Sequence, residues 1–252
     1  MGIAIVCAAL LALPLAATAA TYAAARHRGE SGVAALSPPR AALAFAQEWL
    51  ATVALLAACP WRLPRRASRT CSRIAIFVPE RYCSSATFWY VRRRLRKAGW
   101  ESAAGIDRTR DRDDAAELAS IDACLAALPA GTAVAMIGHG LGGRLALDYA
   151  AARPNIAIRQ IVTLGTPHQG STALPYRALC GSSPSTSVAA RPTDIIAIAS
   201  DFDAWLQPFE RAYHPDGFNI ALRGVGHCAM LLSRRVTDLL VENLNAAPPT
   251  RT

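Results

Sequence analysis

Four glycines crowd into six consecutive residues near the middle of the chain. The apolar run Thr132–Ile137 is followed by Gly138, His139, Gly140, Leu141, Gly142 and Gly143. A strand, a tight turn and a helix start in this order can present a catalytic nucleophile when the turn has the pattern G-x-S-x-G. Such a turn exposes the serine hydroxyl and leaves the next backbone N–H to bind an oxyanion. Here the serine position is Gly140, so the turn suits nucleophilic catalysis but lacks the nucleophile.

The same glycines allow a second interpretation. Gly138, Gly140 and Gly143 satisfy G-x-G-x-x-G after a strand, which is the pattern of a dinucleotide-binding turn. Such a site needs an acidic residue about 20 residues further on, and the segment 160–164 contains none. A dinucleotide-binding protein therefore stays an alternative that leaves the downstream motifs unexplained, and we expect no cofactor.

A more specific motif follows the next apolar run. Residues 161–171 are IVTLGTPHQGS, which resembles the TLGTPHxGS segment of bacterial lipase-like α/β hydrolases. The resemblance covers Arg73 to about Leu244, because the glycine turn precedes this segment and an acid and a histidine follow it in the family's order. It implies an α/β-hydrolase fold whose ancestral reaction was carboxylic-ester hydrolysis.

The resemblance assigns roles to single residues. It implies that Gly140 stands at the nucleophile position, Asp203 is the acid and His227, in Gly224–His227, is the general base. The family's segment YSxxDxxVxP is matched by Ser200, Asp203, Leu206 and Pro208, but Ala199 replaces the tyrosine. Asp201 therefore stays a competitor, and either acid could be an ordinary residue of a surface turn. The histidine of such a triad activates a hydroxyl, and here it has none to activate at position 140.

A second departure from the family concerns the oxyanion hole. Residues 72–78 and then Pro79-Glu80-Arg81-Tyr82-Cys83 resemble the family's strand and HGYxC turn, with Pro79-Glu80 in place of His-Gly. The resemblance implies that the backbone N–H groups of Leu141 and Arg81 form the hole. A carboxylate beside that hole opposes a developing negative charge, so we expect a catalytically inactive pseudoenzyme that acts by binding or scaffolding.

Three alternatives remain. The chain could be an active ester hydrolase that uses Ser84 or Ser85 as the nucleophile, or one in which His227 and Asp203 activate water. Gly140 could also be an engineered replacement in an active lipase, but a single engineered change would not explain Pro79-Glu80.

These residues need an α/β domain with a mainly parallel sheet to position them, and the chain beyond about residue 70 has that pattern. Apolar runs predict six strands, at Arg73–Val78, Trp100–Ile106, Thr132–Ile137, Ile158–Leu164, Asp194–Ser200 and Phe218–Leu222. Amphipathic spacing predicts four helices, at Thr87–Ala98, Asp114–Leu128, Leu141–Ala152 and Leu231–Leu244. Only about two dozen residues lie between Ser171 and Asp194 for a lid, so we expect any apolar groove to be open.

The N-terminal part differs in composition. No residue from Gly2 to Ala25 is charged, which predicts a transmembrane helix, with a cleaved signal peptide ending near Ala17-Thr18-Ala19 as the alternative. The second apolar stretch, Ala41–Cys59, carries Gln47 and Glu48, so it spans the membrane or lies at its surface. We expect residues 1–62 to be a membrane anchor and residues 70–252 to be the α/β-hydrolase-like domain.

Charge and cysteine content bear on partners. The 27 Lys and Arg against 18 Asp and Glu give a net charge of +9, but the densest basic run, 92–97, is spread around a helix and does not indicate a nucleic-acid site. Seven cysteines without metal-ligand spacing predict free thiols and no metal site. Arginines after residue 61 favour a bacterial inner-membrane protein with a cytoplasmic domain, a periplasmic one being the alternative. The expected partners are a membrane and either an acyl or lipid ligand or another protein.

Overall fold

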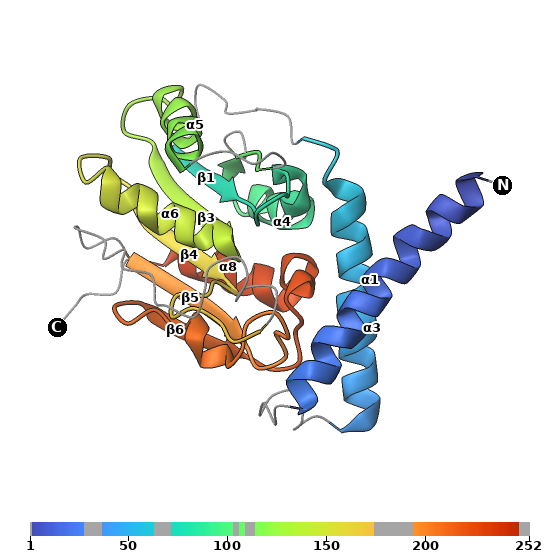
Figure 1. Ribbon diagram of the computed structural model, residues 1–252. Coiled ribbons are helices and arrows are strands. Elements are labelled where there is room, and N and C mark those ends of the chain that lie inside the picture. The colour runs from blue at the N-terminus through green and yellow to red at the C-terminus, as the bar shows by residue number, and fades with distance from the viewer. Residues whose placement is uncertain are drawn as a thin grey trace.

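In the computed structural model, which describes residues 2–27, 37–62, 72–102, 106–108, 114–173 and 194–246, six parallel strands form one sheet (Figure 1). Its order is β2-β1-β3-β4-β5-β6. The strands are β1 (Arg73–Val78), β2 (Glu101–Ser102), β3 (Ala133–His139), β4 (Gln160–Leu164), β5 (Asp194–Ser200) and β6 (Phe218–Leu222). A parallel sheet flanked by helices fits the expected α/β-hydrolase architecture.

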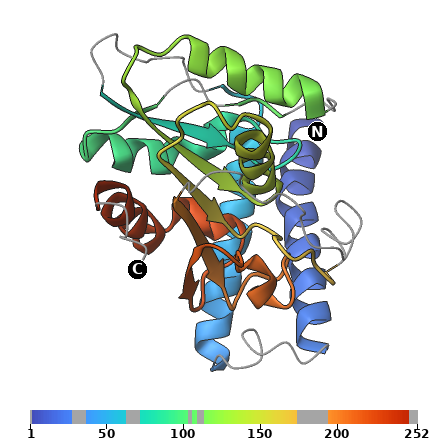
Figure 2. The ribbon, with the colours of Figure 1, turned by 90° about the vertical axis from the view of Figure 1, so that its left-hand side faces the viewer.

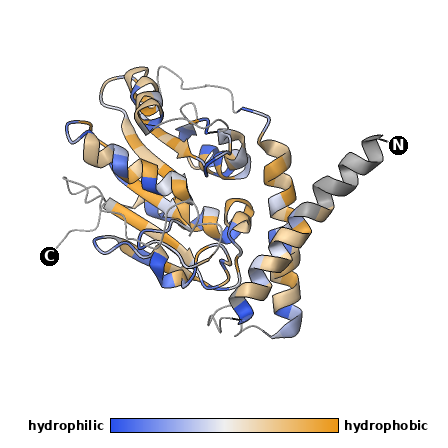
Figure 3. Ribbon diagram, in the orientation of Figure 1, coloured by the Kyte–Doolittle hydropathy of each residue, from blue (hydrophilic) through white to orange (hydrophobic). Residues whose placement is uncertain are grey.

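Alternation along the strands sends apolar side chains to both faces of the sheet. In β1, Ile74 and Ile76 belong to one core and Phe77 to the other; in β3, Met136 and Ile137 divide in the same way. This double burial is the reason that the strands are almost continuously apolar. The apolar colouring of the strands in Figure 3 shows the same pattern.

Helices cover both faces (Figure 2). Helices α4 (Trp89–Lys97) and α8 (Arg234–Asn245) pack on the core that contains Phe77. Helices α5 (Asp114–Ala126) and α6 (Leu141–Ala152) pack on the core that contains Ile76. Short 3-10 helices complete the chain: η1 (Ser85–Phe88), η2 (Phe209–Ala212) and η3 (Cys228–Leu232).

The expected elements differ from the observed ones mainly at their ends. The predicted strand Trp100–Ile106 is reduced to Glu101–Ser102 at the sheet edge, and residues 103–105 lie outside the described residues. The predicted helix Leu231–Leu244 is divided, because the Ser233 side chain accepts the N–H of Val236 and starts α8 there. The segment 174–193, which contains most of the expected lid region, also lies outside the described residues.

The two N-terminal helices, α1 (Gly2–His27) and α3 (Pro38–Ala58), cross each other, with α3 next to the domain and the N-terminal half of α1 pointing away from it (Figure 1); Figure 2 shows them from another side. The buried face of α3 carries Ala44, Glu48, Ala51 and Leu55, which helical spacing places in one stripe. The hydroxyl of Tyr22 in α1 donates to the Phe202 carbonyl at 3.0 Å. The end of α1 and the buried face of α3 therefore pack on the domain that begins near residue 72.

By length and composition, α3 is the one helix of the described part that could cross a membrane. Its buried face contacts the domain from Ala44 to Leu55, and the Ala58 carbonyl oxygen at its end lies 3.5 Å from Ser84 Oγ. Tyr22 likewise packs on the domain, although it belongs to the stretch expected to span the bilayer.

Candidate active site

Gly140 occupies the turn between β3 and α6. Its φ of 53° and ψ of −125° lie in a region that side chains rarely adopt, and its N–H donates to the Leu164 carbonyl at 2.9 Å. The neighbouring glycines are required by close packing: a Cβ on Gly142 would lie 2.1 Å from the Val78 carbonyl oxygen, and one on Gly143 would lie 2.0 Å from Thr166 Oγ1. Packing of the turn thus accounts for these glycines without a bound dinucleotide.

Asp203 and His227 meet at the carboxyl end of the sheet. Asp203 Oδ2 lies 2.7 Å from His227 Nδ1, and both side chains are buried. The other carboxylate oxygen, Oδ1, accepts the N–H groups of Trp205 and Leu206. The competitor Asp201 accepts the N–H of Gly224 at 2.9 Å instead. The structure therefore brings the expected acid next to the expected base.

The PHQGS segment supports the acid. Ser171 Oγ accepts the N–H of Gln207 at 3.1 Å, and the Gln207 amide donates to the Asp203 carbonyl at 2.6 Å. Nearer the turn, His168 Nε2 lies 2.9 Å from Thr163 Oγ1. The motif that carried the resemblance thus holds the Asp203 loop in place.

The Glu80 carboxylate lies on the two N–H groups that were expected to form the oxyanion hole. Its Oε1 accepts the N–H of Arg81 at 2.7 Å, and its Oε1 and Oε2 lie 3.2 and 3.1 Å from the N–H of Leu141. The carboxylate was expected beside these N–H groups; in the structure it accepts from both of them. The loop is held by Arg108, which donates to the Pro79 carbonyl and pairs with buried Glu117.

His227 lies between two carboxylates. Its Nε2 is 3.9 Å from Glu80 Oε2, on the side of the ring away from Asp203. Burial by itself lowers the pKa of His227, but the charge and hydrogen bond of Asp203, joined by those of Glu80, outweigh it and raise the pKa to about 10. The raised pKa favours the protonated ring, and an imidazolium cannot accept a proton from a nucleophile.

Three further residues surround this histidine, and the motif comparison did not identify them. The ring of His139 lies 4.4 Å from that of His227, with its Nε2 3.1 Å from the His227 carbonyl oxygen. The indole of Trp205 stacks on His227 at 5.5 Å. The third is Glu48 of α3, whose carboxylate accepts the N–H groups of Cys228 and Ala229, each at 2.9 Å.

The Glu48 carboxylate lies very close to the backbone at Gly226. A Cβ on Gly226 would lie 2.2 Å from Glu48 Oε2, so only glycine fits there. Glu48 is 1% exposed. Sequence reasoning assigned this residue a cost in lipid, whereas the structure places it in the protein, where it holds the loop that follows His227.

Ser84 and Ser85, the alternative nucleophiles, lie at the start of η1. Ser84 Oγ accepts the N–H of Ala86 at 3.2 Å and lies 3.5 Å from the Ala58 carbonyl oxygen. Both Ser84 and Ser85 are buried. Ser84 is thus the N-cap of η1.

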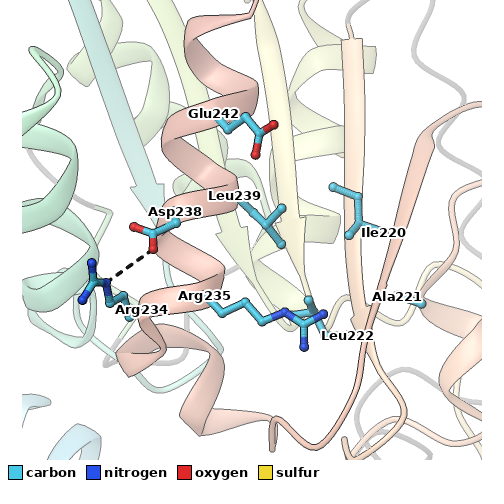
Figure 4. A pocket seen from close by; sticks show the side chains of 8 residues that line it. All are labelled: Ile220, Ala221, Leu222, Arg234, Arg235, Asp238, Leu239 and Glu242. Carbon is cyan, nitrogen blue, oxygen red and sulfur yellow. Dashed lines mark ion pairs between the residues drawn. The ribbon is translucent and has the colours of Figure 1, made fainter.

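A groove of about 450 Å³ lies elsewhere, between β6 and α8 (Figure 4). Charged side chains of α8 line one side, and Arg234 pairs with Asp238 there. None of the residues that line it belongs to the site around His227. Within the described ranges, no three His, Cys, Asp or Glu side chains are grouped so that they could hold a metal ion.

Known proteins resemble this chain in structure. Est1E from Butyrivibrio proteoclasticus has a TM-score of 0.52 at 16% identity, over 73% of this chain and 93% of its own. A monoacylglycerol lipase from Paleococcus ferrophilus has a TM-score of 0.51 at 14% identity, over 72% of this chain and 98% of its own. Aspergillus fumigatus lipase B has a TM-score of 0.58 at 17% identity, over 79% of this chain and 58% of its own.

By sequence, no family model and no curated protein matches the chain. At these identities the structural likeness is one of fold. The chain has the α/β-hydrolase fold, and lipases and esterases are among its structural neighbours.

Proposed function

We propose that this chain is a lipase-like member of the α/β-hydrolase fold that no longer hydrolyses carboxylic esters and acts by binding at a membrane. The observation that carries the proposal is the Glu80 carboxylate on the N–H groups of Arg81 and Leu141. A substrate carbonyl would need both donors, and its oxyanion would develop against an existing negative charge. Loss of even one oxyanion donor typically costs about 100- to 1,000-fold in rate.

The state of His227 supports the same conclusion. Activation of water requires a neutral imidazole, and a pKa of about 10 keeps His227 protonated at neutral pH. Gly140 offers no hydroxyl, and Ser84 is the N-cap of η1. The arrangement thus argues against both alternative routes to ester hydrolysis.

Turnover of short p-nitrophenyl esters by the purified protein tests this proposal. These esters need neither a lid nor a long acyl groove. We expect the wild type and His227→Ala to give the same rate, and a fluorophosphonate probe to label neither. A wild-type rate tenfold or more above that of His227→Ala would show active chemistry at this site and overturn the proposal.

The charge of the site suggests its ligand. Two carboxylates, those of Glu80 and Asp203, lie on either side of His227. We infer that a neutral acylglycerol is preferred to a fatty-acid anion, because a carboxylate head group would be repelled. Trp205 provides a probe, since a ligand that reaches His227 changes the surroundings of its indole. Monooleoylglycerol should change tryptophan fluorescence in the wild type, and neither oleate with the wild type nor monooleoylglycerol with Trp205→Phe should do so.

Membrane attachment is part of the proposal. Leu43 and Leu50 share an outward face of α3 and are 59 and 57% exposed, and α1 begins within the uncharged stretch that follows Met1. Apolar side chains gathered on one exposed helix face favour insertion at the lipid boundary. We infer that α1 supplies the anchor and that α3 lies along the membrane surface.

A further inference from the structure

Large exposed apolar side chains are unevenly distributed over the molecule. In the part of the chain that the structure describes, Phe218 of β6 is the one such side chain that lies away from the N-terminal helices and the loops around the end of α3. The others are Leu15 in α1, Leu43, Leu50 and Leu56 in α3, and then Trp61, Tyr82 and Trp89. Apolar side chains concentrated in this way mark a surface that contacts a protein or a membrane.

Three aromatic side chains come from separate segments that meet where α3 ends. Trp61 follows α3, and its N–H donates to the Ala58 carbonyl at 3.0 Å. The same carbonyl oxygen lies 3.5 Å from Ser84 Oγ. Tyr82 lies two residues before Ser84, and Trp89 begins α4 directly after η1, which Ser84 caps. We call the side chains of Trp61, Tyr82 and Trp89, which are 72, 52 and 44% exposed, the aromatic rim.

Arginine side chains lie beside the aromatic rim. The Arg81 guanidinium lies 5.7 Å from the centre of the Tyr82 ring. Arg93 and Trp89 are four residues apart in α4, so they share the exposed face opposite the buried Leu95. Tryptophan and tyrosine rings are enriched at the level of lipid headgroups, and the long side chains of arginine reach the phosphates there. The residue types of the rim therefore suit a membrane surface.

The outward face of α4 is positively charged. This helix carries five basic residues and no acidic one. Arg94 pairs with Asp238 of α8, whereas Arg93, Arg96 and Lys97 are exposed. Basic side chains next to a bilayer attract anionic lipids. The charge of α4 thus complements an anionic bilayer surface.

The helices next to the rim indicate a bilayer rather than a protein as its partner. No residue from Gly2 to Ala25 of α1 is charged, and α3 is long and apolar enough to cross a membrane. The N-terminal half of α1 points away from the domain on the side where α3 lies (Figure 1). A bilayer that receives α1 therefore lies on the side of the domain that carries the rim.

We propose that the aromatic rim and the outward face of α4 form a docking surface for a bilayer that contains anionic phospholipid. The rings lie at the level of the headgroups, and Arg93 contacts a lipid phosphate. This inference rests on the proposed membrane attachment of α1 and α3, and it brings the α/β domain itself into contact with lipid. Glu80 and Arg81 directly precede Tyr82, so the loop of the oxyanion hole lies at the membrane surface.

Two tryptophans of the rim make the contact measurable. Full-length protein is reconstituted into vesicles of phosphatidylglycerol and phosphatidylcholine, the latter brominated on its acyl chains close to the headgroup, and attachment is read from flotation of the vesicles. Bromine quenches an indole only at close approach. We expect the quenched fraction of the tryptophan emission to be lower in the double variant Trp61→Phe, Trp89→Phe than in the wild type.

A matched control uses the exposed aromatic side chain outside the rim. Phe218 is 60% exposed but lies on β6. Phe218→Trp, added to the double variant, should contribute emission that the brominated lipid does not quench. Equal quenching of a tryptophan at position 218 would overturn the proposal, because contact with lipid would then not be specific to the rim.

Vesicles without phosphatidylglycerol test the charge of α4. The triple variant Arg93→Gln, Arg96→Gln, Lys97→Gln should lose the additional quenching of Trp89 that phosphatidylglycerol produces in the wild type. Arg235→Gln, an exposed arginine of α8, should keep it. Equal quenching of the wild type in both kinds of vesicle would overturn the preference for anionic lipid.

Flotation separates this inference from the proposed function. Protein that floats with the vesicles while Trp61 and Trp89 stay unquenched would overturn the docking surface, assign the rim to a protein partner and leave membrane attachment standing. Protein that does not float would overturn both proposals.

Discussion

Nε2 of His227 faces Oε2 of Glu80 at 3.9 Å, in the direction where a serine hydrolase would present a neutral hydroxyl to its base. With Asp203 on Nδ1 at 2.7 Å, the ring has a carboxylate on each side. The pair of carboxylates raises the pKa of the ring, so its charged form is favoured over the neutral form that a general base needs. That change has consequences for stability that can be measured without knowing any ligand.

Stability should fall as the pH rises from about 6.5 to about 10. His227 has a folded-state pKa of about 10 against an ordinary value of 6.5, so the folded protein binds more protons in this interval than the unfolded chain. The stabilisation is complete below pH 6.5 and is lost as the pH passes through 10, with a slope of up to about 1.4 kcal/mol per pH unit. Urea unfolding of wild type and His227→Gln between pH 6.5 and 10 measures it.

The slope should be absent in His227→Gln, and Glu80→Gln should shift the upper end of the interval to lower pH, because one of the two carboxylates is removed. Equal slopes in the wild type and His227→Gln would show that His227 is not held as an imidazolium.

Serine at position 140 should destabilise the domain. The backbone of Gly140 has a φ of 53°, where a Cβ costs on the order of 1 to 3 kcal/mol. Thermal unfolding of Gly140→Ser should therefore give a lower Tm than the wild type. A Tm that is unchanged or raised would count against strain at this turn.

Rescue of ester hydrolysis should require the oxyanion hole as well as the nucleophile. Gly140→Ser alone leaves the Glu80 carboxylate on the N–H groups of Leu141 and Arg81. The triple variant Gly140→Ser, Pro79→His, Glu80→Gly frees both donors, and its rate on p-nitrophenyl butyrate should exceed that of the single variant by about 100-fold or more.

The control for this rescue is the triple variant with His227→Ala added, which should lose the gain. Gly140→Ser alone could instead reach the rate of an ordinary esterase and depend on His227. The oxyanion loop would then be intact, and Gly140 would be interpreted as an engineered replacement in an active lipase.

Removal of the Glu48 carboxylate should destabilise the fold strongly. Glu48→Ala leaves the buried N–H groups of Cys228 and Ala229 without this acceptor, at a cost of about 3 kcal/mol or more. Gln47→Ala, on the exposed face of the same helix, should stay within about 0.5 kcal/mol of the wild type. Urea unfolding in detergent, followed by tryptophan fluorescence, compares them; a similar loss in both would assign the effect to helix propensity.

Fractionation and reporter fusions test the membrane assignment. We expect the protein in the inner-membrane fraction, with a C-terminal alkaline phosphatase fusion inactive and a C-terminal green fluorescent protein fusion bright, because arginines follow residue 61. Strong phosphatase activity would place the domain in the periplasm. A soluble form that lacks the first twenty residues would indicate a cleaved signal peptide.

Local signals were sufficient for most strands of the sheet and for the turn. Strand β1 is Arg73–Val78 and β5 is Asp194–Ser200, as expected from their apolar runs, and α6 begins at Leu141 directly after the glycine turn. These elements are encoded by residues next to one another, so periodicity finds them. The ends of helices that depend on a single side chain were harder to predict from the sequence. The 3-10 helix η1 replaces the first turn of the helix expected from Thr87, because Ser84 caps η1.

Contacts between residues far apart in the sequence could not be predicted from local patterns. Glu80 was recognised as an electrostatic obstacle from its place in the motif, but its hydrogen bond to Leu141, 61 residues away, depends on the register of β1 and β3. For Glu48, the apolar neighbours in sequence indicated only a membrane span or a position at the membrane surface. Its actual partners are N–H groups at the other end of the domain, and no periodicity or composition identifies them.

The distance along the chain between Glu48 and Cys228, 180 residues, also sets the order of events during synthesis. Ribosomes add about 5 to 20 residues per second, so Glu48 is synthesised roughly 10 to 40 s before Cys228 and Ala229, whose N–H groups it will accept. During that time an apolar helix with one carboxylate has left the ribosome ahead of the domain surface that will receive it. The nascent helix therefore meets chaperone or lipid first, and the seating of Glu48 becomes one of the last steps in the biogenesis of the protein.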